Sequence, residues 1–547
     1  MRYFLLSLSF LFVFSCGQPD PPLTLSNGSI DDPLHERQIG QLAFMSDWVE
    51  YAAFTEEKHL KTINFSNVRE LNCRMYLDKT LTAHLHDLAP SMTVEELCAA
   101  GNFQFTFLVD DQPLYVSNLP TGAGSCWYKN EQTVYGIPLR GKEEMDHWGR
   151  FLWTRFWKLG GGEAALEQGA HQLTIEVRPY LDGETFKTGP VIASGSLQTE
   201  AGAVNLPPAA VAVQPIAPTS TFPISQAVFA QQPIEAINRR IAKGSYEEVT
   251  SLVVLKNGEL LIEEYFNGAS RTTLHDTRSV GKSFAGTLLG MAIADGYLHA
   301  VGQPLADFYD LSNYQHPSSV KAGITLEDLL TMSSTLDGND ADQNSPGHEE
   351  KMYPTTDWVR FTLNLPTRAE QSWQYCTAGV VLLGDILHQR VPGSLEAYAA
   401  ERLFTPLGIT DQQWQHTPTG IGNTAGSLAM SSLSYAAYGQ LYLEDPQGLL
   451  PQGWASKSLS PLVARRADAP GHYGYLFWHD VFSVGDREIA VSYASGNGGN
   501  RITIIPELNA VIVLTATAYG KPSGHHQADQ IVQKVTEALL TLEDAVK

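Results

Sequence analysis

The stretch Thr277-Arg278-Ser279-Val280-Gly281-Lys282-Ser283-Phe284 is the most informative in the chain, because it places a serine three residues before a lysine. The residues from Phe284 to Ile293 are almost all apolar, and this run ends at Asp295-Gly296. The pattern predicts a buried helix that begins near Ser279. Side chains three residues apart share one helix face, so the Lys282 amine can lie beside the Ser279 hydroxyl. An amine that accepts the hydroxyl proton makes the serine a nucleophile toward acyl carbonyls.

The same four-residue pattern occurs again at Ser318-Ser319-Val320-Lys321. Pro317 precedes this second copy, its neighbours are polar, and the next helix is expected to begin near Thr325. We therefore interpret the second copy as a surface loop. The pattern alone is weak evidence, because about one or two matches are expected by chance in a chain of this length.

Further segments follow in a fixed order and give the first copy its context. They are Ile324 to Ser334, Asp357 to Phe361, Leu383-Gly384, and Tyr493 to Asn500 followed by Pro506. Together with Ser279 and Lys282, they resemble the class C β-lactamase-like serine hydrolases, which include penicillin-binding proteins, esterases and 6-aminohexanoate-dimer hydrolases. The resemblance covers about Pro233 to Thr541. It implies an α+β fold, with an antiparallel sheet flanked by helices and a helical subdomain.

The second element of this family is a Tyr-x-Asn segment, which here reads Tyr375-Cys376-Thr377. The resemblance implies that Tyr375 shares proton transfer with Lys282, as a base during acylation and as an acid toward the leaving group. Thr377 replaces the asparagine and is a candidate substrate-binding residue. A threonine hydroxyl offers only one donor, so the replacement affects amide recognition more than nucleophile activation. We interpret Cys376 as a small buried neighbour.

The third family element is Lys-Thr-Gly or His-x-Gly on an edge strand, and here it reads Ala494-Ser495-Gly496. The resemblance makes Ser495 and Gly496 substrate-binding residues, and gives the backbone N–H groups of Ser279 and Asn497 the role of an oxyanion hole. Ala494 stands where the family has a cation that helps to grip a substrate carboxylate. This change favours a neutral carboxylic ester or a small amide as the substrate.

Two other functions remain open at this point. One is a D,D-peptidase or β-lactamase that acts on cell-wall peptides or β-lactams, as in many members of the resembled family. The other is a binding lipoprotein with a silent active site, because the second and third elements are both altered. The preferred hypothesis is an acyl-enzyme hydrolase acting on a small ester, amide or peptide.

The first residues resemble a bacterial lipoprotein signal. Arg2 supplies a positive charge, Phe4 to Phe14 is an apolar run too short to span a bilayer, and the run ends in Val13-Phe14-Ser15-Cys16-Gly17. The resemblance implies that residues 1–15 are removed and that Cys16 is lipidated. We therefore expect an exported bacterial lipoprotein that is anchored to a membrane through Cys16. It would face the periplasm or the cell surface, most simply on the outer membrane.

A chain of 547 residues is too long for a single hydrophobic core, so we expect at least two domains. After the signal peptide (1–15), the expected parts are a tether (16–41), a mainly-β, sandwich-like domain (42–200), a Pro- and Ala-rich linker (201–224) and the hydrolase domain (225–547). Export to an oxidising compartment permits a disulfide among Cys73, Cys98 and Cys126, but the sequence does not select the pair.

The expected elements come from local patterns. In the first domain they are strands over Phe103 to Val109, Gln172 to Arg178 and Val191 to Leu197, with a helix near Met145 to Trp157. In the second domain they are a helix over Pro233 to Lys243, a hairpin from Val249 to Phe266 with its turn at Asn257-Gly258, strands over Glu488 to Ala494 and Arg501 to Thr517, and a helix over Gln527 to Leu542. We expect the strands from the two ends of this domain to share one sheet.

The formal net charge of −23 argues against nucleic-acid binding, which needs a basic surface. The chain has no C-x-x-C pair and no H-E-x-x-H motif, so we expect neither a metal nor another cofactor. We interpret His525-His526 as part of a solvated loop before the last helix. Asp337 to Asp342 is acidic, but it lacks the spacing and the terminal glutamate of an EF-hand loop.

Overall fold

The computed structural model describes residues 23–65, 70–140, 152–166, 169–183, 185–201, 206–218, 221–465, 471–521 and 523–546. The expected signal peptide (1–15) and Cys16 lie outside these residues, as does most of the helix expected near Met145 to Trp157. The chain divides into two compact units, one ending at Asn205 and the other beginning at Leu206. Each unit is described by itself.

The first unit has two sheets over one core. The larger sheet has the strand order β2-β9-β7-β4-β5, with β8 paired to β7, and the smaller has the order β1-β3-β6. The strands are β1 (Leu42–Met45), β2 (Thr62–Asn64), β3 (Leu71–Tyr76), β4 (Gly101–Val109), β5 (Gln112–Asn118), β6 (Val134–Arg140), β7 (Gly169–Asp182), β8 (Phe186–Thr188) and β9 (Ala193–Ala201). Alternate residues of β4, including Phe103, Phe105 and Phe107, are buried in the core that both sheets share. This arrangement matches the mainly-β, sandwich-like expectation.

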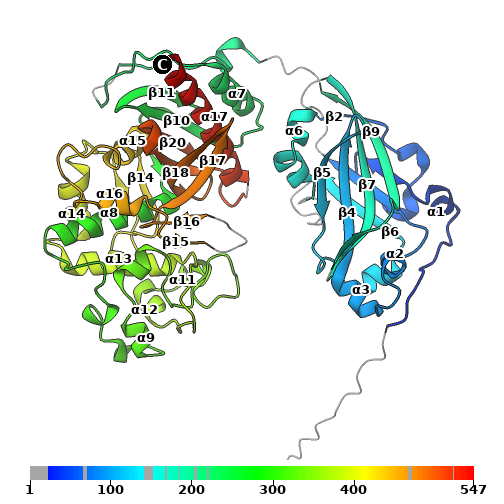
Figure 1. The fold of residues 1–547 in the computed structure, drawn as a ribbon, viewed down its shortest axis with the longest axis horizontal. Helices are drawn as coiled ribbons and strands as arrows, with labels where there is room; N and C mark the ends of the chain where they lie inside the picture. Colours follow the sequence, from blue (N-terminus) through cyan, green and yellow to red (C-terminus); the bar gives the residue numbers. More distant parts are fainter. Residues whose placement is uncertain are drawn as a thin grey trace, which may run out of the picture. The chain divides into compact units, whose positions relative to one another are not determined.

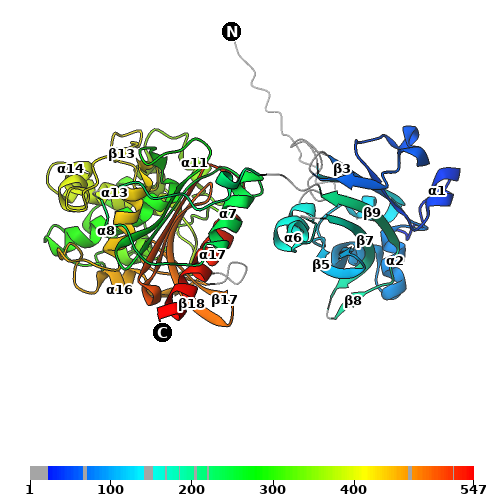
Figure 2. The same cartoon turned by 90° about the horizontal axis from the view of Figure 1, so that it is seen from above.

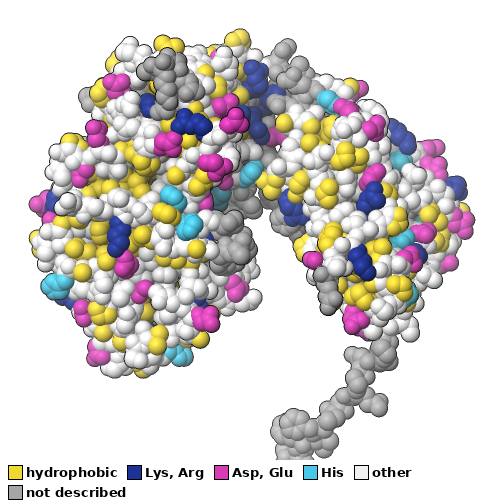
Figure 3. All heavy atoms as spheres, in the orientation of Figure 1, with side chains coloured by type: hydrophobic (Ala, Val, Ile, Leu, Met, Phe, Trp, Pro, Cys, Tyr) yellow, Lys and Arg dark blue, Asp and Glu magenta, His cyan; other side chains and the backbone are white. Residues whose placement is uncertain are grey.

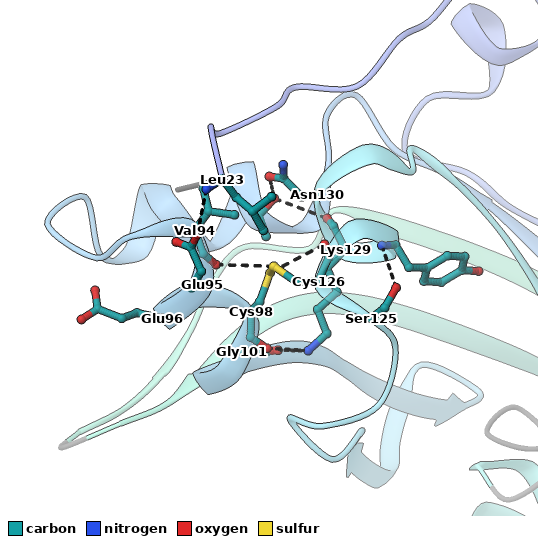
Figure 4. Close-up of a disulfide and its surroundings, with 12 residues drawn as sticks. Leu23, Val94, Glu95, Glu96, Cys98, Gly101, Ser125, Cys126, Lys129 and Asn130 are labelled. Atoms are coloured by element: carbon teal, nitrogen blue, oxygen red, sulfur yellow. Dashed lines mark hydrogen bonds between the residues drawn. A yellow bond between two sulfur atoms is a disulfide. The ribbon is translucent and has the colours of Figure 1, made fainter. Parts of the chain in front are cut away.

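The first unit also contains short helices before and between these strands. They are α1 (Pro33–Gln38), α2 (Leu81–Leu88), α3 (Val94–Ala100), α4 (Cys126–Glu131) and α6 (Gly162–Ala165). A disulfide links Cys98 on α3 to Cys126 on α4, while Cys73 is free and buried. Beside the disulfide, the Lys129 ammonium donates to the carbonyl oxygens of Cys98 and Gly101 at 2.7 and 2.9 Å (Figure 4). The structure thus selects one pair among the three candidate cysteines.

The segment expected to be a tether is bound to the first unit from Leu23 onward. The Leu23 N–H donates to the Glu95 carboxylate at 2.7 Å, and the Thr80 hydroxyl donates to the Ser26 carbonyl at 2.6 Å. Further along, α1 begins with Asp32 as its N-cap. The described part of the expected tether (16–41) is thus hydrogen-bonded to the first unit, because its backbone groups find partners there.

The second unit is built on one antiparallel sheet, which has eight strands in the residues described. The strand order is β11-β10-β20-β19-β18-β17-β16-β15. The strands are β10 (Val249–Lys256), β11 (Glu259–Tyr265), β15 (Val463–Ala464), β16 (His472–Tyr473), β17 (Trp478–Val484), β18 (Arg487–Gly496), β19 (Asn500–Ile505) and β20 (Ala510–Ala516). Since Val253 of β10 pairs with Val513 of β20, the two ends of this unit share one sheet, as predicted.

Helices cover both faces of this sheet (Figures 1 and 2). The helices α7 (Gln232–Ala242) and α17 (Ser523–Val546) pack together over one face, and α17 also contacts β17, β19 and β20. The helices α8 (Gly281–Ala294) and α15 (Ser432–Leu441) contact strands of the sheet, and their apolar side chains belong to a second core. The sheet therefore lies between two apolar cores, as the predicted α+β fold requires.

A helical subdomain completes the second unit. Its helices are α9 (Ser319–Ala322), α10 (Leu326–Leu330), α11 (Glu349–Met352), α12 (Trp358–Leu363), α13 (Thr377–Arg390), α14 (Leu395–Ala399) and α16 (Trp454–Ser458). A small sheet with the order β12-β14-β13 joins His275–Asp276, Leu428–Met430 and Gln413–Trp414. The helix α13 packs on α8, which connects the subdomain to the face of the main sheet.

The linker expected over 201–224 is partly docked on the second unit. The Gln214 N–H donates to Glu264 at 2.8 Å, and the Arg271 guanidinium donates to the Pro218 carbonyl at 2.9 Å. Residues 211–218 of the expected linker thus belong to the second unit.

The surface view in Figure 3 shows acidic and basic side chains scattered over the visible face of each unit. Within the described residues, no helix combines the length and the apolar character needed to cross a membrane.

Candidate active site

Ser279 lies in a short 3-10 turn, Arg278–Val280, that leads directly into α8. The Lys282 ammonium donates to the Ser279 hydroxyl oxygen at 2.8 Å and to the Ala425 carbonyl oxygen at 2.5 Å. Only 1% of Lys282 is exposed, whereas Ser279 is partly exposed. The helix therefore holds a buried amine against a hydroxyl that substrate can reach.

The start of α8 is fixed by close backbone packing. A Cβ added to Gly281 would lie 3.3 Å from the Gly426 Cα, and one added to Gly426 would lie 3.0 Å from the Arg278 carbonyl oxygen. Gly426 has a φ of 156°. Arg278 has a φ of 47°, which lies in the left-handed region that non-glycine residues adopt at a cost in free energy. The nucleophile is thus presented by a strained turn that rests on the segment from Ala425 to Gly426.

Tyr375 lies just before α13 and faces Lys282. The Lys282 Nζ is 5.3 Å from the centroid of the Tyr375 ring. The ring also stacks on Trp478 of β17, with centroids 5.4 Å apart and planes inclined by 24°. The structure therefore brings Ser279, Lys282 and Tyr375 together, and it adds Trp478, which sequence reasoning missed. The place of Trp478 follows from the pairing of β17 with β18, which sets Trp478 opposite Tyr493 near the third element.

Thr377 is fully buried at the first turn of α13, and its hydroxyl donates to the Glu349 carboxylate at 2.9 Å. Its N–H donates to the Asp340 carboxylate at 2.7 Å. Burial, together with the neighbouring Glu349 carboxylate, raises the pKa of Asp340. The structure thus gives the Thr377 hydroxyl a carboxylate partner, whereas Lys282 takes Ser279 and Ala425 as its partners.

Asp340 and Glu349 form an acidic pair behind Tyr375 that the sequence did not indicate. The Asp340 N–H donates to the Tyr375 carbonyl at 2.8 Å, and the Asp340 carboxylate accepts the Glu349 N–H at 2.9 Å. These bonds hold the backbone on both sides of the Tyr375-Cys376-Thr377 segment. The sequence of the acidic run, Asp337 to Asp342, indicated only that it is not an EF-hand loop. Its actual role is to position the second family element.

The end of β18 lies against the nucleophile. A Cβ added to Gly496 would lie 2.5 Å from the Thr277 carbonyl oxygen and 3.3 Å from the Ser279 nitrogen, so only glycine permits this approach. Asn497 follows and is exposed, and its side-chain oxygen accepts the Gly520 N–H at 3.0 Å. Of the two residues predicted to form the oxyanion hole, Ser279 therefore has its backbone nitrogen next to Gly496, and Asn497 directly follows Gly496 in the chain.

Ser495 is 9% exposed, and its hydroxyl lies 3.3 Å from the Nδ1 atom of His525. His525 and His526 belong to the first turns of α17, so the expectation that they form a solvated loop is wrong. The helix begins earlier than its apolar periodicity indicates, because its first residues pack on the loop after β18 rather than on the core: a Cβ at Gly499 would lie 2.7 Å from the Gly524 carbonyl oxygen. Ala494, which replaces the family's cation, is buried in the core.

The second Ser-x-x-Lys copy has a different structure. Ser318 is the N-cap of α9, and Lys321 is fully buried, with its ammonium donating to the carbonyl oxygens of Gln315 and Leu363 at 2.7 and 2.9 Å. The expectation of a surface loop is therefore wrong for Lys321, although no contact between its ammonium and the Ser318 hydroxyl is found among the described residues.

A serine hydroxyl bonded to a buried amine, with a phenol beside that amine, is suited to acyl transfer through a covalent intermediate. Backbone N–H groups near the hydroxyl can stabilise the oxyanion that forms. Among the described residues, no group of three or more His, Cys, Asp or Glu side chains could hold a metal ion.

Comparison with known proteins places this arrangement in a family. Residues 238–536 match the beta-lactamase family, which is more than half of the chain. A curated 6-aminohexanoate-dimer hydrolase of Paenarthrobacter ureafaciens is 25% identical over 232 residues, which are 38% of this chain and 57% of that protein. The match thus spans less than two thirds of the relative's length.

The similar solved structures include the following two. One is an octameric penicillin-binding protein homologue from Pyrococcus abyssi, with 18% identity and a TM-score of 0.46 over 56% of this chain and 77% of that chain. The other is a D-stereospecific amidohydrolase from Streptomyces sp., with 14% identity and a TM-score of 0.41 over 52% of this chain and 93% of that chain.

Proposed function

The chain belongs to the beta-lactamase family of serine hydrolases, and we propose that it cleaves a neutral carboxylic ester or a small amide through an acyl-enzyme at Ser279. The observation that carries this proposal is the 2.8 Å hydrogen bond between the Lys282 ammonium and the Ser279 hydroxyl. Through such a contact a buried amine can take the proton of an accessible hydroxyl as the hydroxyl oxygen attacks a carbonyl carbon.

The proposed reaction begins with attack of the Ser279 oxygen on the substrate carbonyl carbon. In the reactive form Lys282 is a neutral amine, and together with Tyr375 it receives the hydroxyl proton and passes it to the leaving group. The backbone N–H groups of Ser279 and Asn497 stabilise the oxyanion, and each such donor is worth about 3–4 kcal/mol in comparable enzymes. Water then attacks the acyl carbon by the reverse proton route and releases Ser279.

The preference for a neutral substrate rests on the charges around the third element. Ala494 supplies no cation, and the nearby Arg501 is 3% exposed and already paired with Asp529. The third element itself therefore offers a substrate carboxylate no cation, and the Arg278 guanidinium beside the nucleophile is paired with Asp276 at 3.4 Å. The name of the curated relative, 6-aminohexanoate-dimer hydrolase, is consistent with a small amide as an alternative to an ester.

The test is covalent labelling of the full chain with a fluorophosphonate, read by intact-mass spectrometry. We expect one adduct on the wild-type protein and on Ser318→Ala, and none on Ser279→Ala. Absence of any adduct would contradict the proposal and favour a silent binding protein. Stoichiometric capture of benzylpenicillin by Ser279 would instead favour a D,D-peptidase or β-lactamase activity.

We also propose that the protein is exported and lipid-anchored through Cys16. The support is the charged start, the apolar run and the Val13 to Gly17 segment. Metabolic labelling with a palmitate analogue should mark the wild-type protein in a bacterial host and leave Cys16→Ala unlabelled. Equal labelling of both would contradict the proposed anchor.

A further inference from the structure

The first unit exposes three large apolar side chains at the corner where the described chain begins. Leu23 is 47% exposed, Leu25 is 41% exposed, and Trp127 on α4 is 63% exposed. Single exposed apolar side chains are ordinary on a protein surface, whereas a group that includes a tryptophan indicates an interaction surface. We call Leu23, Leu25 and Trp127 the Trp127 patch.

The members of the Trp127 patch lie close together because the first described residues are hydrogen-bonded to α3 and α4. The Leu23 N–H donates to the Glu95 carboxylate of α3 at 2.7 Å (Figure 4). The Asn130 side chain of α4 donates to the carbonyl before Leu25 and accepts the N–H after it, at 3.0 and 3.3 Å. Trp127 precedes Asn130 by three residues, so their side chains share one face of α4.

Covalent and polar contacts fix the shape of this corner. The disulfide between Cys98 and Cys126 joins α3 to α4 immediately before Trp127. The buried Lys129 ammonium donates to the Thr121 carbonyl, in the loop that precedes α4, at 2.5 Å. The Trp127 patch is therefore formed before any partner arrives, and binding requires little additional ordering.

Only a short stretch of chain separates the Trp127 patch from the proposed lipid anchor. Leu23 follows Cys16 by seven residues, which span at most about 25 Å even when fully extended. Leu23 therefore stays within this distance of the residue that would carry the acyl chains. At so short a range the effective concentration of the membrane at the patch is high, so even a weak apolar contact is populated.

We propose that the Trp127 patch contacts the lipid bilayer in which Cys16 is anchored, with the Trp127 indole at the level of the headgroups. An indole has an apolar body and a polar N–H, and this combination favours the boundary between acyl chains and water. The two leucines add apolar surface beside the indole. This inference rests on the lipid anchor proposed above and gives the first unit a membrane-facing surface.

The charges of this corner select the kind of lipid. The described residues of α3 and α4 expose only carboxylates, those of Glu95, Glu96 and Glu131, because Lys129 is buried. Anionic headgroups therefore repel this corner, and zwitterionic headgroups suit it better. The contact is apolar, so high salt, which screens charges, should leave it intact.

The experiment places the lipidated protein, purified from a bacterial host, in phosphatidylcholine vesicles. Bromine on the acyl chains quenches the fluorescence of nearby tryptophans, and vesicles without bromine give the reference emission. We expect quenching in the wild type that is limited to the share of one tryptophan among ten, and its loss in Trp127→Phe. Trp48→Phe is the matched control, because Trp48 is also exposed in the first unit but lies against Gly136 of β6, and it should keep the quenching.

A second variant tests the patch without removing a fluorophore. Leu23→Ser combined with Leu25→Ser keeps every tryptophan and should lower the quenching, while ester hydrolysis stays unchanged. Adding phosphatidylglycerol to the vesicles should also lower the quenching.

Flotation of the vesicles separates the two proposals. Protein that floats with the vesicles but shows no quenching dependent on Trp127 would overturn this inference alone and favour a protein as the occupant of the patch. Quenching that rises with phosphatidylglycerol would also overturn it. Protein that does not float would overturn the proposed anchor and this inference with it.

Discussion

The chain contains the same Ser-x-x-Lys pattern twice, and the two copies are used in different ways. In the first, the Lys282 ammonium donates to the Ser279 hydroxyl at 2.8 Å. In the second, the Lys321 ammonium donates to two backbone carbonyls, and the Ser318 hydroxyl accepts an N–H of its own short helix. Both lysines are buried, so burial of a charged group does not by itself mark a catalytic site.

The difference arises from what precedes and surrounds each helix. Ser279 precedes the 14-residue helix α8 and lies within a strained turn, which leaves its hydroxyl free to point at the lysine. Ser318 is an N-cap, and its hydroxyl is used to satisfy a helix N–H. The lesson is that the partner of the serine decides its chemistry, more than the spacing of the pattern.

The largest expected effect comes from replacing each lysine by methionine. Lys282→Met removes the proton acceptor and should lower kcat/KM for a nitrophenyl ester by about 10³- to 10⁴-fold, and the loss of the donor to the Ala425 carbonyl should cost about 1–3 kcal/mol of stability. Lys321→Met leaves two buried carbonyls without their donor and should cost about 1–3 kcal/mol of stability with a normal kcat. Ester hydrolysis and thermal unfolding of both variants check this. Equal loss of activity in the two would break the comparison.

Tyr375→Phe should have the next largest effect. The ring would keep its stacking on Trp478 and its place beside Lys282, while the hydroxyl is lost. We expect kcat to fall by about 10²-fold with little change in fluorophosphonate labelling yield at long times, because attack by Ser279 remains possible. Trp478→Phe, which retains an aromatic partner, is the control. A normal kcat for Tyr375→Phe would remove the phenol from the mechanism.

Local sequence patterns predicted much of the hydrolase unit. The Asn257-Gly258 turn forms as expected, with both residues in the left-handed region, and α8 ends at Ala294, just before Asp295, as the apolar run indicated. The Ser279–Lys282 contact also follows from helix geometry. These features depend on residues close together in the chain, where turn chemistry and helical periodicity act.

The features that were missed depend on distant residues. His525 meets Ser495 through the packing of α17 on the turn after β18, and Asp340 reaches Tyr375 from a loop with no regular pattern. The burial of Lys321 likewise depends on the carbonyl of Leu363, 42 residues away. No periodicity in a single sequence encodes such contacts, so tertiary packing overrides the local signal.

Glu264 extends the comparison to a buried acid whose hydrogen-bond donors, among the described residues, are an amide side chain and a backbone N–H. It is fully buried and accepts from Asn238 and from the Gln214 N–H, and burial raises its pKa from 4.5 to about 7. The folded protein therefore binds this proton more tightly than the unfolded chain, so stability falls as the pH rises from about 4.5 to about 7.

Glu264→Gln cannot titrate and should escape this fall. At pH 8 the variant should be more stable than the wild type by about 1–3 kcal/mol, and at pH 4 the difference should disappear. Thermal unfolding at the two pH values measures it. A difference that is independent of pH would show that Glu264 does not carry a raised pKa.

The central claim is that Ser279, and not Ser318, forms a covalent acyl-enzyme. Rapid mixing of the full chain with excess 4-nitrophenyl acetate tests it most directly, by measuring the burst of 4-nitrophenolate that accompanies acylation. We predict a burst of about one equivalent per active site in the wild type and in Ser318→Ala, and none in Ser279→Ala. A burst that survives in Ser279→Ala would contradict the account.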